Sequence, residues 1–180
     1  MIKRWLVPIT GFTQELGTPN GFDRLWKRLR NYSSNSVSVV TPQRWRANFD
    51  SLASFIDRQS SPSPDIRIFA YSWGCGHGFL QLAKQLRKRG HKISQAVLCD
   101  PVYHSWLRPW RAMLCSPHIR IPDNVERVRW MRQHQNRPRG TDLVADSPDT
   151  VIDSPVILAR NHEFMDDSPE FQAIAMEAAK

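Results

Sequence analysis

The spacing of apolar positions changes several times along the chain, and the sharpest change lies before its middle. Over 66–70, apolar side chains fall on alternate residues, as they do on a β-strand with two different faces. From Phe79 to Leu86 they recur at the spacing of one helix face, and Gly90 ends the pattern. The sequence therefore predicts a strand, a tight turn and a helix in immediate succession.

Patterns of the same two kinds extend over much of the remaining chain. Amphipathic helices are predicted from Phe22 onward and from Trp45 to Ile56. A last helix has Ser168 as its N-cap and Pro169 as its first residue. Short apolar runs typical of buried strands alternate with these helices, at residues 2–9, 36–40, 95–99, 125–131 and 155–159.

Two segments depart from this alternation. Residues 133–154 are polar and contain proline and glycine, so we expect a long loop there. Between 102 and 122 the periodicity weakens and aromatic residues accumulate around Pro109. This favours a segment that packs over the sheet edge, with the wall of an apolar pocket as the alternative.

Strands that alternate with helices predict an α/β fold. We expect one domain over residues 1–180, with three layers, α/β/α, around a mostly parallel sheet of about six strands. Ligands of such folds bind at the carboxyl ends of the strands. Residues that directly follow a predicted strand are therefore the first candidates for a functional site.

The turn after the central strand reads Ala70-Tyr71-Ser72-Trp73-Gly74. A serine between a strand and a helix, with small residues two positions before and after it, is typical of a nucleophile elbow. Small residues are needed there because the strand and helix backbones nearly touch. The pentapeptide alone is a weak signal that its strand-to-helix context strengthens, and the alternative is a tight turn without chemistry.

Two further residues with suitable chemistry follow predicted strands. Asp100 comes directly after the strand at 95–99, and His162 follows the strand at 155–159. A serine hydroxyl becomes a good nucleophile when a base takes its proton, and a carboxylate orients and stabilises that base. We therefore expect Ser72, His162 and Asp100 to form one hydrogen-bonded catalytic row.

On these residues the chain resembles the α/β-hydrolase superfamily, and within it the lipase-like serine esterases. The resemblance spans nearly the whole chain and rests on 70–74, on 98–101 and on 162–167 ahead of the last helix. In the family, serine, acid and histidine occupy the matching places. Many members take the acid from one strand later, which would recruit a loop aspartate here: Asp142, Asp146, Asp149 or Asp153.

The resemblance also implies an oxyanion hole and a pocket. The oxyanion would accept hydrogen bonds from the backbone N–H of Trp73 and from the loop that contains Gly11 and Phe12. The acyl chain or the leaving group would lie against aromatic residues that follow the acid: Tyr103, Trp106 and Trp110.

Two residues close to the serine have simpler interpretations. Cys75 lies nearly one helical turn past Ser72, so we expect a buried structural thiol there. His77 falls on the helix after the elbow, where we expect it to pack or to cap.

Charge and hydropathy narrow the classes of partner. The net charge is +8, but two of the three basic clusters, at 27–30 and 84–89, lie on the outward faces of predicted helices. No nucleic-acid motif accompanies them, so we expect attraction to anionic surfaces and no nucleic-acid binding. No apolar run approaches the length of a membrane span, and the first residues enter a strand at once, so we expect no transmembrane segment and no cleaved signal.

The cysteines favour a reducing compartment. Cys75, Cys99 and Cys115 are odd in number and show no framework spacing, which predicts free thiols and a cytoplasmic location. A metal site would have to combine Cys115 and His118 with Cys75 and His77. These short pairs form no recognisable zinc module, so we expect no metal.

Together these features predict a serine hydrolase that cleaves a small-molecule ester or a lipid-like substrate through an acyl-enzyme on Ser72, without a cofactor. One alternative is a thioesterase, amidase or acyltransferase that uses the same residues. Another is a noncatalytic binding protein with an α/β-hydrolase-like fold, because fold alone does not determine function.

Overall fold

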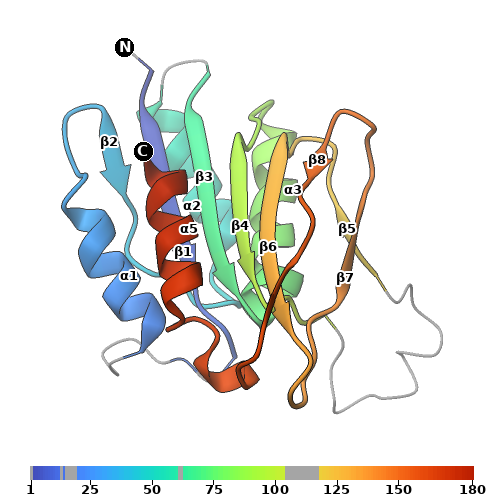
Figure 1. The fold of residues 1–180 in the computed structure, drawn as a ribbon. Helices are drawn as coiled ribbons and strands as arrows, with labels where there is room; N and C mark the ends of the chain where they lie inside the picture. Colours follow the sequence, from blue (N-terminus) through green and yellow to red (C-terminus); the bar gives the residue numbers. More distant parts are fainter. Residues whose placement is uncertain (1, 13, 15–19, 61–62, 104–117) are drawn as a thin grey trace.

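The computed structural model describes residues 2–12, 14, 20–60, 63–103 and 118–180. Their main feature is a seven-stranded sheet with the strand order β2-β1-β3-β4-β6-β8, in which β9 also pairs with β6 (Figure 1). Every pairing in this sheet is parallel. Its strands are β1 (Arg4–Ile9), β2 (Val37–Val39), β3 (Asp65–Tyr71), β4 (Gln95–Cys99), β6 (Arg127–Gln133), β8 (Val151–Ile152) and β9 (Val156–Leu158).

Helices cover both faces of this sheet and complete three layers (Figure 1). On one face lie α1 (Gly21–Arg30) and α5 (Pro169–Ala179), which contact each other. On the other face α2 (Phe49–Gln59) packs against α3 (Leu80–Lys88), which a π-helical segment at Gly74–Phe79 precedes. The predicted fold class, α/β/α around a mostly parallel sheet, is confirmed.

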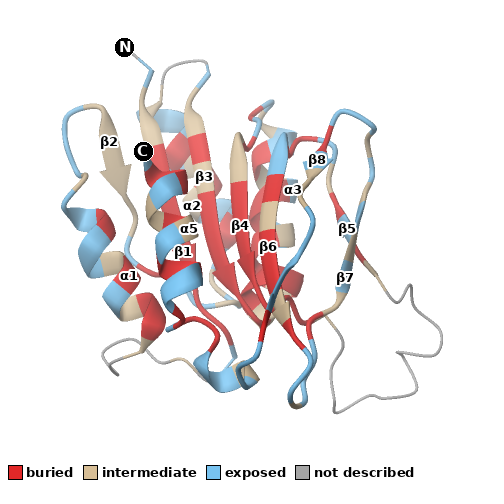
Figure 2. Ribbon diagram, in the orientation of Figure 1, coloured by how far each residue is buried: buried red, intermediate tan, exposed pale blue. Residues whose placement is uncertain are grey.

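The alternating pattern of β3 explains how one strand serves two cores. Ile66, Ile68 and Ala70 are fully buried in the core under α2 and α3. Phe69 and Tyr71 belong to the second core, under α1 and α5. Figure 2 shows the buried residues concentrated along the central strands and on the inward sides of the helices, with exposed residues on their outer sides.

Elements with strong local signals lie where the sequence predicts them. β4 covers the predicted residues 95–99, and α1 begins at Gly21, one residue before the predicted start. α5 begins at Pro169, and the Ser168 side chain accepts a hydrogen bond from the N–H of Phe171, as expected of an N-cap. In each case the local pattern and the tertiary packing favour the same structure.

The second predicted helix starts later than expected. α2 begins at Phe49 with Asn48 as N-cap, whose side chain accepts from the N–H of Ser51. Trp45 therefore lies outside the helix and packs edge-on against Trp73 after β3. Its apolar side chain fits the helical spacing by chance, and the capping residue decides the boundary.

The prediction of a long loop over 133–154 is wrong. This stretch contains β7 (Asp142–Ala145) and β8, and β7 pairs in parallel with β5 (His118–Ile121) to form a separate two-stranded sheet. The strand predicted at 125–131 is displaced by two residues at each end, to Arg127–Gln133. β7 is half-exposed along its length, so it lacks the continuous apolar run that marks a buried strand.

The weakly periodic segment at 102–122 is described only in part. Residues 104–117, with Trp106, Trp110 and Cys115, lie outside the described residues. Within the described parts of the chain, no helix combines the length and apolar character that crossing a membrane requires.

Candidate active site

Ser72 lies directly after β3, at the tip of the predicted tight turn. Its φ of 53° falls in the left-handed region, which a non-glycine residue adopts at a cost in strain. Two backbone hydrogen bonds hold the turn, from Ser72 N–H to the carbonyl of Cys99 (2.9 Å) and from Val102 N–H to the carbonyl of Ser72 (3.1 Å). The serine is therefore anchored to β4 and to the chain that follows it.

The small residues on either side of Ser72 are needed for space. Ala70 is fully buried in β3. A Cβ atom at Gly74 would lie 2.7 Å from the carbonyl oxygens of both Ile9 and Thr10, which are backbone atoms at the end of β1. This close approach of backbones is the contact that the small-residue pattern predicts.

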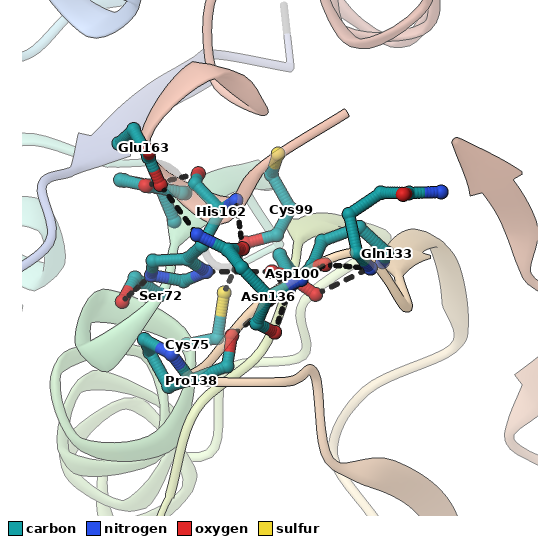
Figure 3. A network of polar contacts seen from close by, with 11 residues as sticks. Ser72, Cys75, Cys99, Asp100, Gln133, Asn136, Pro138, His162 and Glu163 are labelled. Carbon is teal, nitrogen blue, oxygen red and sulfur yellow. Dashed lines mark hydrogen bonds and ion pairs between the residues drawn. The ribbon is translucent and has the colours of Figure 1, made fainter. Parts of the chain in front are cut away.

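Three side chains from distant parts of the sequence form a hydrogen-bonded row at the carboxyl edge of the sheet (Figure 3). Ser72 Oγ lies 2.8 Å from His162 Nε2, and His162 Nδ1 lies 2.6 Å from Asp100 Oδ2. With Nδ1–H donating to Asp100, Nε2 is free to accept the serine proton. The structure thus brings together the three residues that the sequence predicts as a catalytic row.

Asp100 is the fully buried end of this row. Like Ser72 it has a positive φ, 43°, directly after a strand. The N–H of Gln133 donates to Asp100 Oδ1 (3.2 Å), and the Gln133 side-chain amide donates to Oδ2 (3.1 Å). A buried carboxylate requires such partners, because an unpaired charge away from water is costly.

His162 begins a short 3₁₀ turn, His162–Phe164, and its backbone is held on both sides. Its N–H donates to Asn136 Oδ1 (2.7 Å), and its carbonyl accepts from the Tyr71 hydroxyl (2.6 Å). The Tyr71 ring also stacks on the imidazole, with centroids 5.2 Å apart. Burial raises the pKa of Tyr71 well above its usual value, so its hydroxyl remains a donor.

The alternative acids of the 133–154 stretch do not contact His162. Asp142 pairs with Arg132, Asp146 pairs with Arg120 (2.7 Å) and Asp153 pairs with Arg127 (3.0 Å), while Asp149 is exposed. The carboxylate that contacts His162 Nδ1 is that of Asp100. The geometry therefore favours the acid at the end of β4.

The residues expected at the oxyanion hole gather beside Ser72. Trp73 follows the serine at the helix start, and its ring packs against Phe12, with centroids 5.5 Å apart. The N–H of Gly11 donates to the side-chain oxygen of Gln14 (3.0 Å). The amides of Trp73 and Phe12 are therefore the more direct candidates for binding an oxyanion.

A cavity of about 570 Å³ opens at Ser72 and His162. It has an aromatic part and a polar part, as ligand sites commonly do. The predicted pocket residue Tyr103 is not among its lining residues, because its ring stacks on His77 instead (5.8 Å between centroids). The cavity is lined by Phe12, Gln14, Asn20, Gly21, Arg24, Tyr71, Ser72, Trp73, Pro138, His162, Glu163, Phe164, Asp166 and Asp167.

The charged residues of this cavity are paired within the chain. Arg24 donates to Asp167 (2.6 Å), and Glu163 accepts from Asn136 (2.8 Å). Hydrogen bonds from its own backbone N–H and from Asn136 lower the pKa of Glu163. Burial raises the pKa of Asp166, although hydrogen bonds from Gln14 and from the first N–H groups of α1 oppose the rise.

Cys75 and His77 lie beside the serine but outside the row. Cys75 is fully buried, as expected, and burial raises the pKa of its thiol well above the usual value, so it is a poor nucleophile. The His77 ring stacks on Trp73 at 4.6 Å between centroids, which is a packing role. In the described residues, no group of three or more His, Cys, Asp and Glu side chains is placed to hold a metal ion.

Two residues that contact the row are missing from the sequence prediction. Gln133 ends β6 and Asn136 lies in the loop after it, and both belong to residues 133–154, which the sequence predicts as a long polar loop. A glutamine and an asparagine in a polar stretch carry no signal of their own. A prediction that β6 ends at Gln133 would have placed that residue at the carboxyl edge of the sheet beside Asp100.

The fold and the row together define an α/β protein whose parallel strands present a serine, an imidazole and a carboxylate in contact. Among solved structures, the chain is similar to the RedJ-Thioesterase from the prodiginine biosynthetic pathway in Streptomyces coelicolor, with a TM-score of 0.56. The sequences are 13% identical, and the match covers 99% of this chain and 85% of that chain. At this identity the likeness shows the fold alone. No protein-family model matches the chain, and a search of curated proteins finds no match.

Proposed function

We propose that the chain is a serine hydrolase of the α/β-hydrolase superfamily that cleaves carboxylic esters through an acyl-enzyme on Ser72. The observation that carries the proposal is the row from Ser72 Oγ through His162 to Asp100, with distances of 2.8 and 2.6 Å. These distances are within reach for proton transfer, and the row opens into a cavity large enough for a small ligand.

The chemistry follows the order of the row. His162 Nε2 takes the hydroxyl proton as Ser72 Oγ attacks the ester carbonyl, and Asp100 stabilises the imidazolium. The negative charge that develops on the carbonyl oxygen is stabilised by hydrogen bonds from the backbone N–H groups of Trp73 and Phe12. His162 then protonates the leaving alcohol, and a water molecule activated by His162 hydrolyses the acyl-enzyme and regenerates the serine.

The cavity supports a small or lipid-like uncharged substrate. Its aromatic part, which includes Phe12, Trp73 and Phe164, can hold an acyl chain, and its charged residues are already paired within the chain. The predicted pocket residues Trp106 and Trp110 remain candidates for the same role.

The catalytic scheme needs no cofactor. Free thiols at Cys75 and Cys99 support the cytoplasm as the proposed location.

Thioester hydrolysis is the second candidate. One solved structure with a similar fold is that of a thioesterase. The same row would attack a thioester carbonyl, and the leaving thiolate is a better leaving group than an alkoxide. Initial rates on an oxygen ester and a thioester with the same acyl group, compared as kcat/KM, separate the two substrates.

Labelling with a fluorophosphonate probe tests whether Ser72 is an activated nucleophile. We expect the folded protein to be labelled, Ser72→Ala to lose the label, and hydrolysis to fall by about 10⁴-fold or more in that variant. Ser63→Ala, which changes an exposed serine before β3, is the matched control and should keep both. A folded but unlabelled wild type would favour the noncatalytic binding protein, and labelling that persists in Ser72→Ala would refute the proposal.

A further inference from the structure

Gln133 is an uncharged side chain with no solvent exposure at the carboxyl end of β6. Through its backbone N–H and its side-chain amide it contacts both oxygens of Asp100, at 3.2 and 3.1 Å. Two donors from one residue fix the orientation of the carboxylate plane. Asp100 Oδ2 is thereby held facing His162 Nδ1 (Figure 3).

The same amide also organises the loop that follows β6. Its oxygen accepts from the N–H groups of Gln135 (2.6 Å) and Asn136 (3.0 Å). Its nitrogen donates to the carbonyls of Asn136 (3.1 Å) and Pro138 (2.9 Å). The side chains at 134, 135 and 137–139 are exposed, so the buried amide, rather than an apolar core, gives this loop its shape.

Asn136 connects this loop to the base. Its side-chain oxygen accepts from the backbone N–H of His162 (2.7 Å), and its side-chain nitrogen donates to Glu163 (2.8 Å). Contacts therefore run from Asp100 to Gln133, on to Asn136 and His162, and back to Asp100. This closed ring fixes acid and base relative to each other, in addition to the contacts that Tyr71 at the end of β3 makes with His162.

We propose that Gln133 and Asn136 are positioning residues that together hold Asp100 and His162 at the spacing needed for proton transfer. This inference rests on the proposed function. Neither residue lines the cavity at Ser72, so neither is placed to contact the substrate. Both act through the row, and their loss displaces the imidazole. They also contact Pro138 and Glu163, which line the cavity, so a smaller effect on substrate binding accompanies the effect on the row.

The consequence is a separation of kcat from KM. A displacement of about 1 Å in a catalytic group costs up to about 100-fold in rate. We expect Asn136→Ala, which removes the acceptor of the His162 N–H, to lower kcat about tenfold and to change KM by a much smaller factor. Asn136→Asp retains the acceptor for the His162 N–H but places a second carboxylate against Glu163, so it should recover part of the rate that Asn136→Ala loses. Asn136 is only partly buried, so these variants should fold.

A buried position requires a more conservative change. Gln133→Glu keeps the shape of the side chain but replaces the donor to Asp100 with a second carboxyl group. We expect a larger fall in kcat than in Asn136→Ala and an altered pH profile, because the new carboxyl group titrates beside the acid. Gln135→Ala is the control, since it removes an exposed side chain from the same loop.

The decisive experiment combines kinetics with the low-field proton NMR resonance of His162 Nδ1–H. This resonance reports the hydrogen bond to Asp100 whether or not the substrate is known. We expect it in the wild type, Gln135→Ala and Asn136→Asp, and we expect it broadened or lost in Asn136→Ala and Gln133→Glu. An unchanged resonance and unchanged kcat in Asn136→Ala would overturn the inference, as would a wild type without the resonance. A different outcome separates the two proposals. If the wild type hydrolyses esters no faster than Ser72→Ala but the resonance is lost in Asn136→Ala, the positioning role stands and the proposed hydrolase is refuted.

Discussion

Ser72 and Asp100 each follow directly after a strand, and different contacts hold the two residues in place. Each places a non-glycine residue in the left-handed region, at φ values of 53° and 43°. Around Ser72 the strained turn is enclosed by backbone packing, with Gly74 against the end of β1. At Asp100 the side-chain carboxylate is held by two hydrogen bonds from Gln133. We call the turn at Ser72 the packed end and the turn at Asp100 the polar end. We infer that close packing at the packed end stabilises the fold, and that hydrogen bonds at the polar end orient the acid for catalysis.

Gly76→Ala should cause the largest loss of stability, because it tests the packed end. A Cβ atom there would overlap the carbonyl oxygen of Val102 and lie 2.7 Å from the Tyr103 Cα. Backbone atoms cannot move aside cheaply, so we expect the free energy of unfolding to fall by about 3 kcal/mol or more. Urea denaturation followed by circular dichroism measures this loss.

Gly90→Ala is the matched control for that variant. It has no atom within 4 Å of the added Cβ but a φ of 76°, so its cost is backbone strain alone, about 1 kcal/mol. If Gly76→Ala and Gly90→Ala lost the same free energy of unfolding, the close packing around Gly76 would add nothing to stability beyond the backbone strain that Gly90→Ala introduces.

Gly140→Ala tests the polar end. The added Cβ would overlap Asp100 Oδ1 and lie 3.1 Å from the Arg132 Cβ, so the carboxylate must rotate out of line with His162. We expect kcat to fall by about 100-fold, with a loss of about 1–2 kcal/mol in the free energy of unfolding. Arg139→Ala, an exposed neighbour, should change neither quantity. A destabilised variant that keeps full activity would contradict the division between the two ends.

The smallest expected effect is a pH dependence of stability that His77 contributes at the packed end. His77 stacks between Trp73 and Tyr103, and its Nε2 has no hydrogen-bond partner among the described residues. Burial lowers the pKa of His77, although a hydrogen bond to the backbone of Tyr103 opposes the shift. Below about pH 6.5 the unfolded chain therefore binds the proton more readily than the folded chain, and stability falls as the pH falls.

His77→Phe keeps the stacked ring but cannot titrate. From pH 7.5 to 5.5 the wild type should lose more stability than this variant, as measured by denaturation at both pH values. The free energy of unfolding should therefore change more steeply with pH in the wild type than in His77→Phe. Because solvent reaches part of the ring, we expect the difference between the two slopes to be well below that for the uptake of one whole proton. Parallel pH dependences in the two proteins would show that His77 adds no cost in acid.

The same contrast explains which features could be predicted from the sequence. The elbow, β4 and α5 have local signals: small residues around a serine, an apolar run, and a serine–proline helix start. The row needed only the rule that carboxyl ends of parallel strands share one edge. Asp100 and His162 could be placed by that rule because each follows a strand.

The polar contacts that hold Asp100 could not be predicted in this way. Gln133 acts through a buried amide whose partners are mostly backbone atoms, and such contacts leave no periodic pattern. β5 and β7 pair across more than twenty residues of chain and are partly exposed, so neither has the continuous apolar run of a buried strand.

The most direct test of the central claim is to trap the acyl-enzyme. The protein is mixed with an activated short-chain ester, quenched in acid within the first turnover, and mapped by peptide mass spectrometry. The account predicts one added acyl group on the peptide that contains Ser72, and none in Ser72→Ala. An acyl group on a different residue, or ester cleavage that continues undiminished in Ser72→Ala, would contradict it.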